Sequence, residues 1–258
     1  MDAYKKVAKS RDSHRPSGAY FINRLLTHFT EQHGDRRFAD DGAIIGGIGF
    51  LNEMPVTIIA MERGADVSER MKRNFGCPSP EGYRKALRLM KQAEKFKRPV
   101  ICIINSSGAY CGIGAEERGQ GLAIAENLME MMTLKTPVIS IVTGEGGSGG
   151  ALALSVADSI FMLENAVYSV ISPEGCASIL WKDASKAPEA AEALKLTAAD
   201  LYGFEIVDKV IDEENKSYEE ICDDLKLELI RELEKLNKLP KDKLLNRRYD
   251  KFRKIGKR

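Results

Sequence analysis

The 258-residue chain predicts an α/β fold, in which repeated strand–strand–helix (ββα) units wind into a spiral around a parallel sheet. Two observations support this prediction. Short apolar runs typical of buried parallel strands alternate with helix-forming segments, a spacing that favours right-handed crossovers. Glycine-rich loops also follow two of these runs, at the strand ends where α/β folds bind ligands.

The N-terminal part begins with an amphipathic pattern that predicts a helix over Ala19–Phe29. The apolar runs Ala43–Phe50 and Pro55–Met61 predict two strands joined by a short turn. Pro80 then opens a helix that continues over Tyr83–Phe96, since proline is favoured in the first helical turn.

The central part repeats this order of strand and helix. We expect a buried strand over Pro99–Asn105, a glycine-rich loop over Ser107–Gly114 and a long helix over Ala115–Met132. A second buried strand, Pro137–Val142, leads into the glycine-rich segment Thr143–Gly150, TGEGGSGG. Both loops therefore follow parallel strands.

The last part adds two strands and several helices. The strands are expected at Ser159–Leu163 and Val167–Val170, after an apolar helix over Ala151–Val156. We expect a helix over Pro188–Leu194, and Thr197–Asp200 resembles a capping box before a short helix.

A long helix with an apolar stripe is expected over Tyr218–Leu236, and Pro240 ends it. The basic tail that follows is interpreted as a solvated helix face, with a docking surface for an acidic partner or a phosphate as the alternative. We expect one domain over residues 1–258, with a core over about 19–211 and a helical C-terminal extension over about 212–258.

Composition and charge set broad limits on function. The net charge of +1 gives no field that would attract nucleic acid or a membrane. The N-terminal segment lacks the apolar region of a secretory signal, and no apolar run is long enough to span a bilayer. We therefore expect a cytoplasmic protein that binds neither nucleic acid nor a membrane.

The cysteines predict free thiols, because their number is odd and none forms a C-x-x-C pair. The five cysteines are Cys77, Cys102, Cys111, Cys176 and Cys222. No metal site is expected. Cys111 lies in the first glycine-rich loop, which leaves open a role as nucleophile.

The segment Thr143–Gly150 carries five glycines directly after a buried strand. Glycine at this density indicates positive φ or close approach of the backbone to a ligand. The first amides of the following helix have no intrahelical acceptor, and the helix dipole adds positive charge there. We therefore predict a strand-to-helix turn whose amides stabilise an oxyanion.

Other kinds of site fit this segment less well. No lysine follows Gly150, which excludes a P-loop, and the G-x-G-x-x-G pattern at 144–149 is weak evidence alone. Ser148 has no histidine after it, as a serine hydrolase would need, because the histidines are His14, His28 and His33. Glycines that only permit close packing of helix and strand remain an alternative.

The two glycine loops can converge on a single oxygen, because both follow neighbouring parallel strands. Glu116, Glu117 and Glu145 are either catalytic bases or solvated and ion-paired carboxylates. No Ser-His-Asp triad is expected either, because all three histidines lie near the N-terminus. Catalysis by backbone amides is therefore the main hypothesis.

Four runs closely resemble the family of bacterial acetyl-coenzyme A carboxylase carboxyltransferase alpha subunits. They are Arg73–Lys91, Gly112–Gln120, Gly144–Leu154 and Tyr168–Ala184. The resemblance extends from about His14 to the tail, and it implies a crotonase-like (ClpP/crotonase) spiral.

The resemblance also implies an activity. With a separate zinc-ribbon beta subunit, as α2β2, such chains transfer the carboxyl group from carboxybiotin to acetyl-coenzyme A. The product is malonyl-coenzyme A, in the first committed step of fatty-acid biosynthesis. Biotin is attached to a separate biotin carboxyl carrier protein, and ATP is used only by a separate biotin carboxylase. The biotin ureido group itself takes the acetyl proton, which explains the missing triad.

The resemblance, together with the chemistry of the glycines, gives candidate site residues. The backbone oxyanion donors are Gly108, Ala109, Gly146 and Gly147. Gly149 and Gly150 would permit close approach of helix and ligand, while Arg73, Asn74 and Tyr83 would line the substrate site.

The first loop departs from the family pattern. The usual D-T-P-G-A-Y-P-G is replaced by N-S-S-G-A-Y-C-G at 105–112, and the loss of both prolines makes the loop less pre-organised. Two rival functions stay open. One is an acyl-coenzyme A hydratase or isomerase of the same fold, with Glu116 or Glu117 as its catalytic acid or base. The other is a scaffold whose loops only pack against a partner.

Overall fold

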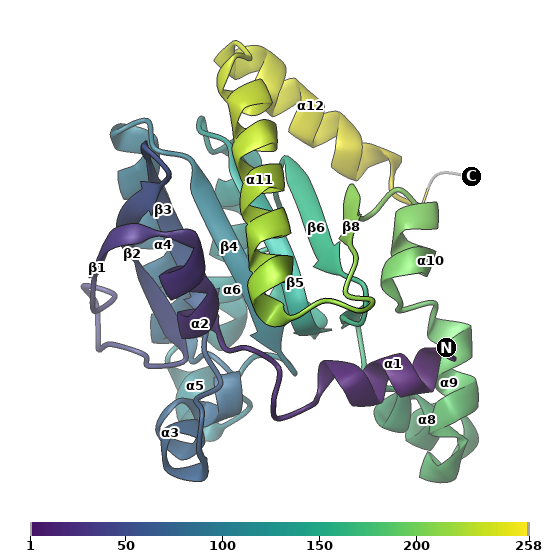
Figure 1. Ribbon diagram of the computed structural model, residues 1–258. Coiled ribbons are helices and arrows are strands. Elements are labelled where there is room, and N and C mark those ends of the chain that lie inside the picture. Colours follow the sequence, from purple (N-terminus) through teal and green to yellow (C-terminus); the bar gives the residue numbers. More distant parts are fainter. Residues whose placement is uncertain (1, 257–258) are drawn as a thin grey trace.

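The computed structural model describes residues 2–256, and its centre is one mixed, eight-stranded sheet (Figure 1). The strand order is β1-β2-β3-β4-β5-β6-β8, and β7 pairs with the end of β5. The pairs β1–β2 and β2–β3 are antiparallel, and all later pairs are parallel, as predicted. The strands are β1 Thr27–Glu31, β2 Ile44–Leu51, β3 Met54–Met61, β4 Val100–Ser106, β5 Val138–Gly147, β6 Ser159–Leu163, β7 Val167–Ser169 and β8 Lys209–Ile211.

Helices cover both faces of the sheet. In the view of Figure 1, α2 and α11 lie in front of the strands, and α4 and α6 lie behind them. None of the helices described is long and apolar enough to cross a membrane. They are α1 Ala3–Ser10, α2 Gly18–Leu25, α3 Val67–Lys72, α4 Pro80–Lys95, α5 Ile113–Glu117, α6 Gln120–Thr133, α7 Ser148–Leu152, α8 Pro173–Trp181, α9 Ala187–Leu194, α10 Ala198–Gly203, α11 Tyr218–Asn237 and α12 Lys241–Lys254.

Several predicted elements are confirmed because local signals and burial agree. Strands β2 and β3 form the expected hairpin, and α4 begins with Pro80 in its first turn. Thr197 and Asp200 form the predicted capping box of α10. The apolar stripe of α11 is buried and belongs to the main core cluster.

Three predicted helices are wrong in extent. The helix expected over Ala19–Phe29 ends at Leu25, because the chain turns into the edge strand β1, which pairs with β2. Gly119, at φ +83°, divides the expected helix over Ala115–Met132 into α5 and α6. The helix expected over Ala151–Val156 is instead α7, which begins at Ser148 and ends at Leu152.

The glycine-rich segment also differs from its prediction. Thr143–Gly147 continue β5 instead of forming a turn, because β7 pairs with Glu145–Gly147. The change from strand to helix is therefore compressed between Gly147 and Ser148, and Ser148 has φ +52°. We call Gly147–Gly150 the glycine step.

The basic tail is not simply a solvated face. Arg248 on α12 is fully buried and pairs with Asp158. The division into a core over 19–211 and an extension over 212–258 stays a prediction. Helix α11, which belongs to the expected extension, shares the main hydrophobic core with the sheet. Residues 257 and 258 of the tail lie outside the described residues.

Candidate active site

The glycine step lies at the carboxyl end of β5, directly against the first glycine-rich loop. A Cβ atom on Gly147 would lie 2.1 Å from the carbonyl oxygen of Ser107. A Cβ atom on Gly150 would lie 2.4 Å from the amide nitrogen of Ala109. Only glycine permits this contact, so the sequence motif and the convergence of the two loops have the same physical cause.

Two polar groups at this contact have no partner. Among residues 2–256, no acceptor pairs with the amide of Ala109, whereas the amide of Gly108 donates to Ser106 Oγ at 3.1 Å. The hydroxyl of Tyr83 is fully buried and also lacks a partner in the described part of the chain. It lies 2.9 Å from where a Cβ on Gly150 would be. Unpaired groups in such a place are unusual and suit a ligand oxygen.

Tyr83 stays protonated at this position. Burial raises the pKa of its hydroxyl well above the ordinary range, because the phenolate would be desolvated. The hydroxyl is therefore a neutral hydrogen-bond donor beside the glycine step.

The other candidate glycines of this segment, Gly146 and Gly149, lie at the same end of β5 but have different surroundings. Gly146 is inside the sheet, registered with Ser106 on β4 and Tyr168 on β7. Gly149 has room around it, since its nearest neighbour to a Cβ would be Ile124 at 3.8 Å. The structure therefore brings the predicted glycines together, with Gly147 and Gly150 in the tightest contacts.

Arg73 and Asn74 do not point at the glycine step. Arg73 donates to the carbonyl of Gly42 at 2.8 Å, and the side-chain amide of Asn74 lies 3.4 Å from Ser79 Oγ. Both residues belong to the segment after α3, which holds the start of α4 in place.

The segment after α1 supplies contacts that sequence reasoning missed. Arg11 Nε donates to Glu145 Oε1 at 2.7 Å, and Arg15 Nε donates to the carbonyl of Thr143 at 2.8 Å. Figure 1 shows this segment crossing the carboxyl ends of the central strands. No local pattern marks these arginines, because their partners lie more than a hundred residues away in the chain.

The side chains offer no alternative mechanism at the glycine step. Glu145 is ion-paired with Arg11, as the structural interpretation of that carboxylate predicted, and Glu116 and Glu117 are exposed on α5. Cys111 is exposed, and neither it nor Ser148 is hydrogen-bonded to a histidine among the residues described. Over residues 2–256, no cluster of His, Cys, Asp and Glu is arranged to hold a metal ion.

Solved structures share this fold. Transcarboxylase 12S superimposes with a TM-score of 0.71 over 86% of this chain and 42% of that chain, at 18% identity. A Pseudomonas malonate decarboxylase hetero-tetramer in complex with coenzyme A gives a TM-score of 0.67 over 82% of this chain and 86% of that chain, at 17% identity. The chain therefore has the crotonase-like α/β fold of these two structures.

The family follows from sequence. The sequence family described as acetyl co-enzyme A carboxylase carboxyltransferase-like matches residues 1–256 of this chain. The chain belongs to this family and has the function of its alpha subunit, the carboxyltransferase component of acetyl-coenzyme A carboxylase.

Two relatives illustrate the match. An alpha subunit from Ruminiclostridium cellulolyticum is 57% identical over 99% of this chain and 98% of its own length. A Clostridium tetani protein whose name covers subunits beta and alpha is 54% identical over 99% of this chain and 45% of its own length. Membership of the alpha-subunit family thus implies a beta-subunit partner.

Proposed function

We propose that this chain and a separate zinc-ribbon beta subunit transfer the carboxyl group of carboxybiotin to acetyl-coenzyme A. The product is malonyl-coenzyme A, in the first committed step of fatty-acid synthesis. The observation that carries the proposal is the contact of the glycine step with the first loop, which leaves the Ala109 amide without an acceptor.

The chemistry at this site is electrostatic. Transfer of a carboxyl group to an acetyl carbon passes through an enolate, whose oxygen needs hydrogen-bond donors. The amides of Gly108, Ala109, Gly146 and Gly147 are the proposed donors, with Ala109 as the best placed, because its N–H is unpaired. An unpaired amide equally suits the ureido oxygen of biotin. When bound, carboxybiotin supplies the carboxyl group, and the chain supplies position and charge stabilisation.

The assembly is part of the same proposal. The alpha and beta subunits form α2β2, a biotin carboxyl carrier protein delivers biotin, and biotin carboxylase alone uses ATP. The joint beta/alpha name of the Clostridium tetani relative supports a stable alpha–beta contact. We place the protein in the cytoplasm, where its five free cysteines would stay reduced.

The experiment is a reconstitution. The chain is mixed with the beta subunit, and malonyl-coenzyme A decarboxylation is measured with free biotin. Activity that needs both chains and biotin supports the proposal, and its absence contradicts it. Glu116→Gln and Glu117→Gln test the hydratase or isomerase alternative, because near-normal turnover in both variants counts against a catalytic role for these carboxylates.

A further inference from the structure

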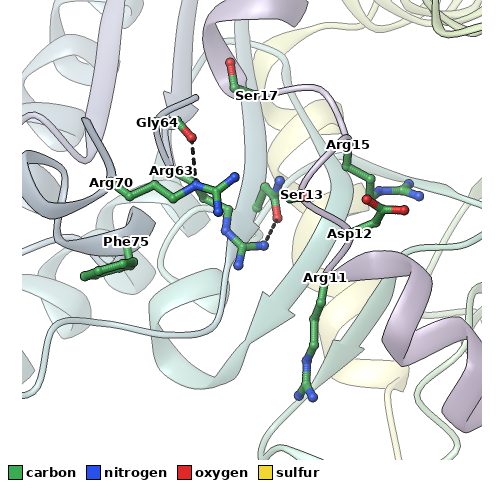
Figure 2. A pocket seen from close by; sticks show the side chains of 10 residues that line it. Arg11, Asp12, Ser13, Arg15, Ser17, Arg63, Gly64, Arg70 and Phe75 are labelled. Carbon is green, nitrogen blue, oxygen red and sulfur yellow. Dashed lines mark hydrogen bonds between the residues drawn. The ribbon is translucent and has the colours of Figure 1, made fainter. Parts of the chain in front are cut away.

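A small pocket of about 80 Å³ lies between the segment after α1 and the residues around α3, and arginines dominate its lining. Its lining includes Arg11, Arg15, Arg63, Arg70, Phe75 and Asn105. Figure 2 shows Arg63 and Arg70 reaching into the space between Phe75 and the segment that carries Ser13.

Two of these arginines are neutralised by carboxylates. Arg11 lies 2.7 Å from Glu145 and 2.8 Å from Glu174. Arg15 lies 2.9 Å from Glu213, and both of those side chains are buried. These pairs leave little charge for a ligand.

Arg63 and Arg70 are different. Arg63 shares Glu145 with Arg11 at the longer distance of 3.6 Å, and its bond to Asn105 Oδ1 is 3.4 Å long. Arg70 makes one bond, from Nε to the carbonyl of Gly64 at 3.3 Å, and no carboxylate pairs with it in the described chain.

The pocket contains one further carboxylate, which is engaged elsewhere. Asp12 accepts hydrogen bonds from the backbone and the ring of His14, on the exposed side of the pocket. Arg70 therefore has no carboxylate partner in the described chain, and Arg63 has only a shared one at 3.6 Å. A guanidinium pair with free N–H groups binds phosphate in a fork-like geometry.

Phe75 adds an aromatic surface to the same pocket. The residue is 55% exposed, and its backbone is held at φ +55°, which is unusual for a bulky residue. Asn105 connects the pocket to β5, since its side-chain oxygen accepts the amide of Glu145 at 3.2 Å, two residues before the glycine step. The pocket therefore borders the strand that leads into the glycine step.

We propose that Arg63 and Arg70 bind a phosphate group of the coenzyme A substrate, with Phe75 against its nucleotide portion. This inference rests on the proposed function. Coenzyme A carries both phosphates and a purine, whereas biotin carries neither, so an arginine pair beside an exposed aromatic ring fits the first substrate. The alpha subunit thereby contributes to recognition of both substrates.

The test uses the reconstituted alpha–beta complex and the variants Arg63→Met and Arg70→Met. Lys72→Met is the matched control, because Lys72 is exposed on the same helix as Arg70 and does not line the pocket. KM is measured for malonyl-coenzyme A and for free biotin, and decarboxylation is repeated with malonyl-pantetheine, which lacks the nucleotide and its phosphates.

The loss of one charge-assisted phosphate contact should raise KM for malonyl-coenzyme A about tenfold. In the Arg63→Met and Arg70→Met complexes, KM for biotin and the rate with malonyl-pantetheine should stay within about twofold of wild type. In the Lys72→Met complex, KM for malonyl-coenzyme A should also stay within about twofold of wild type. An unchanged KM for malonyl-coenzyme A would overturn the inference. A rise for biotin or an equal loss with malonyl-pantetheine would also overturn it, because the pocket would then serve another group.

Calorimetry with inorganic phosphate tests whether the pocket binds free phosphate instead of coenzyme A. If phosphate binds wild type by calorimetry while KM for malonyl-coenzyme A is unaffected by Arg70→Met, the pocket holds free phosphate and the coenzyme A assignment is wrong. If the wild-type complex is inactive, the proposed function fails. Calorimetry with coenzyme A then still tests the pocket, since weaker binding by Arg70→Met than by Lys72→Met supports the site and equal binding contradicts it.

Discussion

Arg248 Nη2 and Asp158 Oδ2 lie 2.6 Å apart, and neither side chain has any exposed surface. Arg248 also donates to the carbonyl groups of Met131, Leu134 and Thr136. Because Asp158 directly precedes β6, this pair fastens α12 to the sheet and to the end of α6. A basic residue of the tail is thus part of the core.

Replacing Arg248 by methionine should lower the free energy of unfolding by about 3–5 kcal/mol, because Asp158 would remain as an unpaired buried charge. Arg247→Met is the control, since Arg247 is half-exposed and 3.7 Å from Glu232. It should cost at most about 1 kcal/mol. Urea unfolding of both variants checks the prediction, and equal losses would contradict it.

Removing the hydroxyl of Tyr83 should leave stability unchanged or raise it, because the group is buried without a partner in the described residues. If the hydroxyl donates to a reacting oxygen, kcat should fall about tenfold in Tyr83→Phe. Thermal unfolding and decarboxylation kinetics measure the two effects. An unchanged kcat would remove Tyr83 from the site.

Glu174 gives a pH-dependent contribution to stability. Hydrogen bonds from Arg11 lower its pKa below the ordinary value of 4.5. A lowered pKa in the folded state means that stabilisation is complete above the unfolded value and is lost as pH falls through the folded one. Wild type should therefore exceed Glu174→Gln in stability above about pH 5, and the difference should shrink toward pH 3. Urea unfolding across this range checks it; a pH-independent difference would refute it.

The cysteines should react in order of exposure. Burial raises the pKa of Cys102 and Cys222 to about 12, whereas Cys111 is exposed. Iodoacetamide at pH 8 should modify Cys111 first, and should modify Cys102 and Cys222 only after unfolding. Mass spectrometry of tryptic peptides identifies the sites. Early labelling of Cys102 would contradict the packing described here.

Much of the fold follows from local sequence. The apolar runs of β4 and β5 predict buried parallel strands, and the stripe of α11 predicts its buried face. Two of the wrong boundaries have tertiary causes. Pairing with β2 turns Thr27–Glu31 into a strand, and pairing with β7 keeps the first glycines of the TGEGGSGG segment in β5.

The candidate site was only partly predictable. Glycines report close contact, so the motif marks the segment, but only the structure shows that Gly147 and Gly150 make its tightest contacts with the first loop. Arg11 and Arg63 could not, because arginine is common on surfaces and their contacts depend on the folding of distant segments. The burial of Arg248 was missed for the same reason.

The central claim is that the Ala109 amide stabilises an oxyanion of the reaction, either the enolate oxygen or the ureido oxygen of biotin. Replacing Ala109 by lactic acid exchanges this N–H for an ester oxygen with little other change. The matched control is glycolic acid at Gly121, an amide in the first turn of α6 with open space beside it. In the alpha–beta complex, kcat for malonyl-coenzyme A decarboxylation should fall about a hundredfold or more at Ala109 and stay near wild type at Gly121. A wild-type kcat with the ester at Ala109 would contradict the account.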